Sequence, residues 1–114
     1  MYTVYKYPIE EDKINETFYV RLPKGAEVIS AVDVTPTSGY IYALVDNQEK
    51  ETRDREVVWY GTGWPVDVSK TGTFQFIGTF KETPPHFRPM YWHVWVQKEV
   101  WMDEFDFPFD KLLC

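Results

Sequence analysis

The stretch Tyr91-Trp92-His93-Val94-Trp95-Val96-Gln97-Lys98 alternates between two kinds of side chain. Its two sets of positions are Trp92, Val94 and Val96 on one side, and Tyr91, His93 and Trp95 on the other. Because successive side chains of a β-strand point to opposite faces, this spacing predicts a strand with one buried apolar face. The other face carries rings and an imidazole, and His93 there fits either a structural side chain or a ligand contact.

Runs of alternating or β-branched residues recur along the chain before this stretch, at Tyr2–Tyr7, Glu16–Arg21, Glu27–Val34, Tyr40–Val45, Arg55–Tyr60 and Thr73–Phe80. Segments rich in Pro, Gly, Asp, Asn and Ser separate them, as at turns. Short strands with a spacing of roughly 8–12 residues are typical of sandwiches and barrels. We therefore expect a mainly β fold, a compact antiparallel sandwich or barrel of about seven short strands. The acidic Glu10-Glu11-Asp12 is interpreted as an exposed turn, and no helix is expected before residue 96.

The 114 residues fit one domain, which we place at residues 1–96. Residues 97–114 form a different segment, in which acidic residues alternate with Trp101 and three phenylalanines. This acidic-aromatic C-terminal tail is expected to be a short helix or an extended tail. Such segments dock onto apolar grooves, so the tail packs on its own subunit, contacts another subunit or binds a host protein.

Charge and cysteine content exclude several classes of protein. The formal net charge is −6, from 18 acidic and 12 basic residues, which disfavours nucleic-acid backbones and anionic membranes as partners. The single cysteine, Cys114, permits no intramolecular disulfide. The chain shows neither a signal-peptide pattern nor an apolar run of about 20 residues that would span a membrane. We expect a soluble, cytoplasmic protein that binds no polynucleotide and no membrane.

The segment Trp59-Tyr60-Gly61-Thr62-Gly63-Trp64-Pro65 is the strongest candidate binding site in the sequence. Its rings can stack on planar groups, and glycines let a ligand approach backbone amides next to a hydroxyl. A turn between two strands, flanked by core aromatics, explains the same residues. The candidate ligand-binding residues are Tyr60, Gly61, Thr62, Gly63 and Trp64, with further stacking rings at Tyr91 or Trp95.

Phosphate contacts are expected from arginine, because a guanidinium grips phosphate with two parallel hydrogen bonds. Arg88, in the stiff Pro84–Pro89 segment, is the preferred candidate, followed by Arg55. The alternative for Arg55 is a solvated hairpin in which it pairs with Asp54 or Glu56. His93 completes the set of candidate ligand-binding residues.

No catalytic constellation is present in the sequence. His86 and His93 are seven residues apart, which is not the spacing of a helical zinc motif. Neither phosphate-loop fingerprint surrounds Gly61–Gly63, and no serine lies in a nucleophile elbow. We therefore expect a protein that is not an enzyme and that carries no cofactor or metal.

An ordered set of short motifs supports a resemblance. Leu22-Pro23-Lys24-Gly25-Ala26, Tyr42–Asp46, Gly61–Pro65, Phe76–Thr79 and Trp92–Trp95 follow one another in the order found in a family of small phage proteins long without an assigned function. The chain resembles that family over residues 4 to 96. The family is in turn similar to phage sponges that sequester the cyclic dinucleotide signals of bacterial CBASS immunity.

The resemblance implies an anti-defence protein of the host cytoplasm that binds a cyclic nucleotide without chemistry. It also implies a homo-oligomer, a dimer or a tetramer, with ligand at subunit junctions. Of the candidate residues, only Gly61–Trp64 and His93 match the family's pattern closely enough for a binding role to be carried over. The alternatives are a phage inhibitor that contacts a host protein through the acidic-aromatic tail, and a minor virion or scaffold component.

Overall fold

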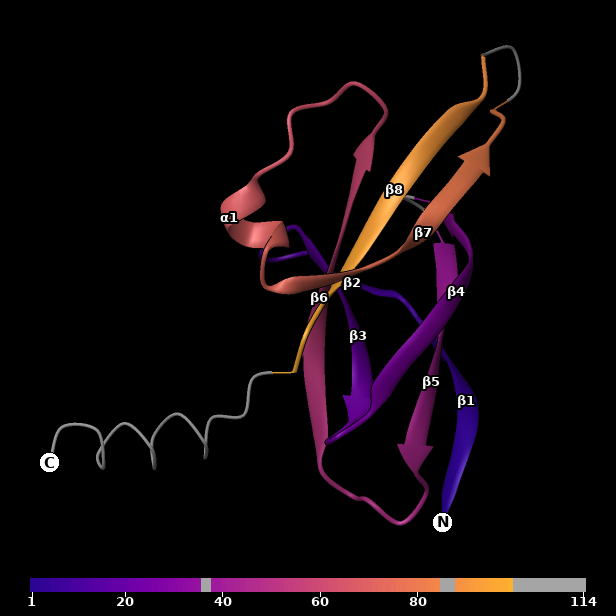
Figure 1. The fold of residues 1–114 in the computed structure, drawn as a ribbon, viewed down its shortest axis with the longest axis vertical. Coiled ribbons are helices and arrows are strands. Elements are labelled where there is room, and N and C mark those ends of the chain that lie inside the picture. The colour runs from indigo at the N-terminus through magenta and orange to yellow at the C-terminus, as the bar shows by residue number, and fades with distance from the viewer. Residues whose placement is uncertain (36–37, 85–87, 100–114) are drawn as a thin grey trace, which may run out of the picture.

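The computed structural model describes residues 1–35, 38–84 and 88–99, and Figure 1 shows how their elements are arranged. This part of the chain holds eight strands and one short helix. In chain order they are β1 (Tyr2–Pro8), β2 (Glu10–Asp12), β3 (Thr17–Pro23), β4 (Glu27–Thr35), β5 (Ser38–Asp46), β6 (Thr52–Gly61), α1 (Val68–Thr71), β7 (Phe74–Glu82) and β8 (Met90–Gln97). The prediction of a mainly β fold is confirmed.

The strands form two antiparallel sheets. The first has three strands in the order β1-β5-β4, and the second has five in the order β2-β3-β6-β8-β7. β8 therefore lies inside the larger sheet, between β6 and β7, as Figure 1 shows. Both sheets contribute to one core, which contains Val28, Ile41 and Val45 from the first and Val20, Val57 and Val94 from the second. The structure thus has two separate sheets with facing apolar sides, as in a sandwich.

The alternation in β8 places its side chains as the sequence predicts. Trp92, Val94 and Val96 are buried in the core, whereas the side chains between them are half-buried or exposed. β5 follows the same rule, with Ile41, Ala43 and Val45 buried. Burial of one face of each sheet supplies the main driving force for the fold.

Two elements differ from the sequence-based expectation. Glu10–Asp12 is not a turn but a short strand, β2, which pairs with β3 at the edge of the larger sheet. Its three residues are all acidic and show no alternation of apolar and polar side chains that would predict a strand. It is a strand because it pairs with β3. The segment Val68–Thr71, where no helix is expected, forms the helix α1. Asp67 caps this helix by accepting hydrogen bonds from the backbone amides of Ser69 and Lys70. A helix of one turn is too short to show helical periodicity.

The end of the described chain is fastened to the domain by a buried ion pair. Residue 97 still belongs to β8, and two residues later the Glu99 carboxylate accepts the Gly25 amide at 2.9 Å from both oxygens. The same carboxylate lies 3.9 Å from Arg55 Nη2, with both side chains less than one-tenth exposed. Arg55 also donates to the Ala26 carbonyl, and burial lowers the pKa of its guanidinium, while Glu99 opposes that shift. The expected helix or extended tail beyond residue 99 lies outside the described residues.

We predict that Glu99→Ala lowers the free energy of unfolding by about 3 kcal/mol, because the substitution leaves the buried Arg55 guanidinium without its counter-charge. Urea denaturation monitored by circular dichroism measures the loss. A double variant, Arg55→Met with Glu99→Leu, should lose less stability than Glu99→Ala alone, since it removes both charges.

The matched control for the Glu99 variant is a more exposed ion pair made by Arg53, which lies on β6 like Arg55. Arg53 Nη2 lies 3.1 Å from Glu51 Oε2 with both side chains well exposed, so Arg53→Ala should cost less than about 1 kcal/mol. An equal loss from Glu99→Ala and Arg53→Ala would show that burial does not strengthen the Arg55–Glu99 contact.

Three exposed aspartates make the stability of the fold sensitive to acid. A side-chain hydrogen bond from Asn15 lowers the pKa of Asp12, a backbone amide at Gln48 lowers that of Asp46, and the Ser69 side chain lowers that of Asp67. In each case the folded state holds the carboxylate in its charged form more strongly than the unfolded chain does. The stability that these groups add is complete above the unfolded pKa of about 4 and is lost as the pH falls through the lower folded values.

We therefore predict that the melting temperature changes little between pH 7 and about pH 5 and falls below about pH 4. A triple variant, Asp12→Ala with Asp46→Ala and Asp67→Ala, should melt at a lower temperature at pH 7 but should lose less on acidification. Differential scanning calorimetry from pH 7 to pH 2 makes the comparison. Parallel curves for the two proteins would contradict the assignment.

Candidate functional site

The candidate site lies on the face of the larger sheet that points away from the core. Its three strands are β6, β8 and β7, with β8 in the middle. Tyr60 and Thr79 are the cross-strand partners of His93, one on each side, and Phe76 is the partner of Trp95. Thr62 follows directly after β6. We call these six residues the β8 outer face: Tyr60, Thr62, Phe76, Thr79, His93 and Trp95.

One part of the β8 outer face is a row of three polar side chains, those of Thr62, His93 and Thr79. Thr62 Oγ1 lies 2.8 Å from His93 Nε2, and Thr79 Oγ1 lies 2.9 Å from His93 Nδ1. Both ring nitrogens are therefore hydrogen-bonded, which fixes the orientation of the imidazole. In a neutral ring one nitrogen donates and the other accepts, so one threonine accepts the ring N–H and the other donates its hydroxyl proton.

Next to this row lies a cluster of three rings. The Trp95 ring centroid is 5.7 Å from that of Tyr60 and 5.0 Å from that of Phe76, and both contacts are edge-to-face. Such contacts hold aromatic side chains in defined positions. Phe76 is nevertheless 51% exposed. The cluster is thus an ordered aromatic surface with a face still open to solvent.

A β-bulge in β7 allows Phe76 and Thr79 to share this face. The register runs from Phe76 opposite Trp95 to Gly78 opposite Val94, which leaves Ile77 as the extra residue. Without the bulge, two residues three positions apart would point to opposite faces of the strand. Ile77 instead packs against the core, whereas Phe76 and Thr79 are both exposed on the outer face.

The glycine-rich segment after Tyr60 is a tight turn. The Trp64 amide donates to the Gly61 carbonyl at 3.0 Å, and Gly63 has a φ of +88°, at the third turn position, where a type II turn favours glycine. The Trp64 indole packs on Gly61, where a Cβ would come within 2.9 Å of the ring. It also meets the Trp92 ring edge-to-face at 5.2 Å. Both glycines are therefore explained by the turn and its packing.

The structure brings together only some of the residues expected to bind a ligand. Tyr60, Thr62 and His93 meet on the β8 outer face, and Gly61 and Gly63 shape the turn beside it. Trp64 is half-exposed but packs on Trp92, whose ring belongs to the core side of β8. The aromatic partners of Tyr60 are instead Trp95 and, through it, Phe76.

The two candidate arginines lie elsewhere. Arg55 is 4% exposed and occupies the core side of β6, where it pairs with Glu99 and not with Asp54 or Glu56. It is a core ion-pair partner rather than an accessible phosphate contact. Arg88 is exposed and lies in the Pro84–Pro89 segment, two residues before β8 begins. It is five residues from His93, up to roughly 17 Å along an extended chain.

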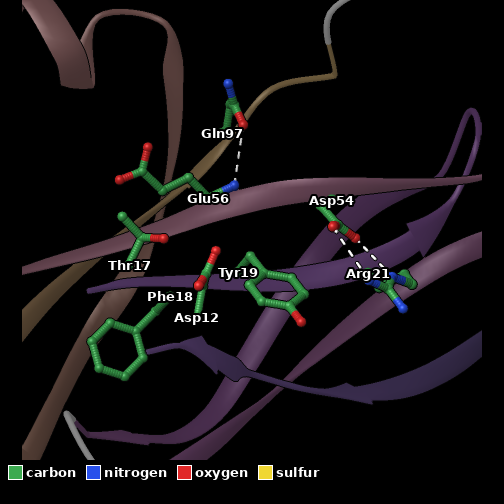
Figure 2. Close-up of a pocket in the computed structure, with 8 residues that line it drawn as sticks. All are labelled: Asp12, Thr17, Phe18, Tyr19, Arg21, Asp54, Glu56 and Gln97. Atoms are coloured by element: carbon green, nitrogen blue, oxygen red, sulfur yellow. Dashed lines mark hydrogen bonds and ion pairs between the residues drawn. The ribbon is translucent and has the colours of Figure 1, made fainter. Parts of the chain in front are cut away.

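Two hollows occur on another part of the larger sheet. Figure 2 shows the larger one, of about 360 Å³, which is lined by Asp12, Thr17, Phe18, Tyr19, Arg21, Asp54, Glu56 and Gln97. A second, of about 300 Å³, shares Thr17, Phe18 and Glu56 with it. Arg21 is already occupied by a two-point contact with Asp54, at 2.8 and 3.4 Å. The remaining carboxylates repel an anion, and none of the residues expected to bind a ligand lines either hollow.

The sequence did not identify Phe76 and Thr79 as candidates. Their signal is the pairing register of β7 with β8, which becomes visible only once the bulge at Ile77 is known. In residues 1–35, 38–84 and 88–99, no group of three or more His, Cys, Asp or Glu side chains is placed to hold a metal ion. No helix in the same residues is both long and apolar enough to cross a membrane.

Comparisons with other proteins give one result. Searches against curated proteins and against solved structures returned no match. A family model described as a domain of unknown function, DUF7352, matches residues 1–102. This match includes all eight strands and every residue of the β8 outer face. The chain therefore belongs to the DUF7352 family.

Proposed function

We propose that this protein binds a small signalling nucleotide, a cyclic dinucleotide in the first place, on the β8 outer face and holds it without chemical change. The proposal rests on one observation: an aromatic surface and a polar surface lie side by side on the same sheet. An ordered ring cluster, Tyr60–Trp95–Phe76, adjoins a hydrogen-bonded polar row, Thr62–His93–Thr79. A nucleotide needs both, because its base is planar and its phosphate and sugar are polar.

The ring cluster suits a base because its members are held in place before a ligand arrives. Trp95 is fixed between Tyr60 and Phe76 by two edge-to-face contacts. Stacking of a base on such a ring contributes about 1–3 kcal/mol and tolerates any base, since every base has an aromatic face. The half-exposed Phe76 offers the apolar area that a ligand would cover.

The polar row suits a phosphate or a sugar hydroxyl. With a neutral His93, the threonine that accepts the ring N–H keeps its own hydroxyl proton and can donate it to an anionic oxygen. The other threonine, which donates to the ring, keeps lone pairs for a sugar hydroxyl. The row therefore offers both a donor to an anionic oxygen and an acceptor to a sugar hydroxyl.

The same geometry favours binding over catalysis. His93 contacts Thr62 as a base would contact a nucleophile, but its second nitrogen meets Thr79. In the Ser-His-Asp triad a carboxylate occupies that second position and stabilises the imidazolium that forms. None of the carboxylates in the described residues is bonded to His93, and no metal-binding group accompanies it. We accordingly propose a protein without enzymatic activity or cofactor.

Charge supports a small ligand over a polynucleotide. The net charge of −6 repels a long phosphate backbone, whose binding depends on many cationic contacts. A single cyclic dinucleotide needs few, and Lys81 and the exposed Arg88 lie on the β7–β8 hairpin beyond His93. Sequestration of a host defence signal by a phage protein in the host cytoplasm is the role that we assign to this binding.

We predict that native mass spectrometry with cyclic AMP, cyclic di-AMP, cyclic di-GMP, cyclic GMP–AMP and cyclic tri-AMP reveals one preferred ligand, released unchanged on denaturation. Trp95→Leu should weaken the affinity for it about 5- to 150-fold, the equivalent of 1–3 kcal/mol for one lost stack. Thr62→Ala with Thr79→Ala should weaken it further, and isothermal titration calorimetry measures both changes.

The matched control is Tyr40→Leu, which removes an exposed ring from β5 in the other sheet. Its affinity for the preferred nucleotide should equal that of the unaltered protein. Absence of any mass gain across the five nucleotides would overturn the proposal. Equal weakening by Tyr40→Leu and Trp95→Leu would move the binding site away from the β8 outer face.

A further inference from the structure

The two sheets have four edge strands, which differ in how well they are protected. β4 and β7 lie beside each other, and Gln75 on β7 donates to the Val28 carbonyl on β4 at 3.1 Å. β2 is only three residues long and entirely acidic. Among the strands that the structure describes, β1 is thus the one long edge without such protection, and Figure 1 shows it outermost, beside β5. Long unpaired edges are templates for a further strand.

The backbone groups that β1 presents can be assigned from its two ends. The Met1 carbonyl accepts the Asn47 amide, and the Ile9 amide donates to the Gly39 carbonyl, so both residues point their backbone groups toward β5. The register between them is unbroken. Because backbone direction alternates along a strand, every odd-numbered residue of β1 bonds to β5 and every even-numbered one points outward. Pro8, which has no N–H, occupies one of these outward positions.

These outward groups are complementary to themselves. We infer that β1 pairs with β1 of a second copy of this chain, antiparallel, about a two-fold axis at Val4. Tyr2 then lies opposite Lys6 of the second copy, and the two Val4 residues lie opposite each other. All of these positions point outward, so each pair exchanges both backbone hydrogen bonds. An axis midway between two residues would set outward groups against inward ones. An axis at Thr3 would shorten the ladder, and an axis at Tyr5 would place Pro8, which has no N–H, opposite Tyr2.

The side chains of β1 fit this pairing. Val4 is 50% exposed and would meet its own copy, which removes apolar area from water. Lys6 is the only charged residue of β1 and already lies 4.5 Å above the Tyr40 ring of its own sheet. In the dimer it would also approach Tyr2 of the second copy, whose strand neighbour is the anionic Asp46. The pairing therefore brings no like charges together, although the chain as a whole is acidic.

The inference concerns the smaller sheet and does not depend on nucleotide binding. Its sharpest test is site-specific disulfide formation in a Cys114→Ser background under mild oxidation. In Val4→Cys the two cysteines face each other with Cα atoms about 5.5 Å apart, within the range of a disulfide. In Lys6→Cys, the matched control, symmetry places them about 14 Å apart, four residues out of register. We expect a covalent dimer from Val4→Cys at least tenfold faster than from Lys6→Cys.

Proline substitution tests the same backbone assignment. Val4→Pro removes an outward donor and should leave the fold stable but monomeric in sedimentation velocity, where the unaltered protein is dimeric. Thr3→Pro removes a donor to β5 and should lower the melting temperature. If Val4→Pro fails to fold, Val4→Lys replaces it, because two like charges on the axis block the pairing. A monomeric unaltered protein, or equal cross-linking rates at residues 4 and 6, would overturn the inference.

Discussion

The structure depends on β8, because this strand contributes to the core and to the outer face at the same time. Hydrogen-bonded on both sides, it holds β6 and β7 in register. Its apolar side chains, Trp92, Val94 and Val96, lie in the core. Because side chains alternate along a strand, the residues between them must point to the opposite face of the sheet. His93 and Trp95 are consequently positioned by the hydrophobic effect acting on their neighbours. The candidate site gains its order from the core that lies beneath it.

The buried pair between Arg55 and Glu99 performs a different task. Buried ion pairs contribute little net stability, but removal of one partner is costly. Here the pair joins β6 to residues just beyond β8 and, through Gly25, to the turn between β3 and β4. The contact therefore fixes where Glu99 lies after β8. The guanidinium can be buried among apolar side chains because it also donates a hydrogen bond to the Ala26 carbonyl.

The sequence allowed the strands and their faces to be predicted, because a period of two is a local signal. It was uninformative wherever the decisive partner was distant. Arg55 is a candidate phosphate contact in the sequence, with a solvated hairpin as the alternative, and nothing near it in the sequence indicates burial against Glu99. Thr79 is not among the candidate residues of the sequence analysis, although it bonds to His93 across the sheet. In the glycine-rich segment, the interpretation as a turn flanked by packed aromatics accounts for Gly61 and Trp64. Tyr60 and Thr62 fit the ligand-binding hypothesis as well as the turn.

The bulge at Ile77 has a consequence for how this protein can change over generations. It makes the distance between Phe76 and Thr79 an odd number of residues while both side chains stay on one face. A point substitution in β7 alters a single contact, but a deletion or insertion of one codon there would turn either the ring or the hydroxyl into the core. A sequence that keeps both side chains on this face therefore cannot gain or lose a single residue between them. Members of the family can be grouped by whether they keep this three-residue spacing between the ring and the hydroxyl, without knowledge of their ligands.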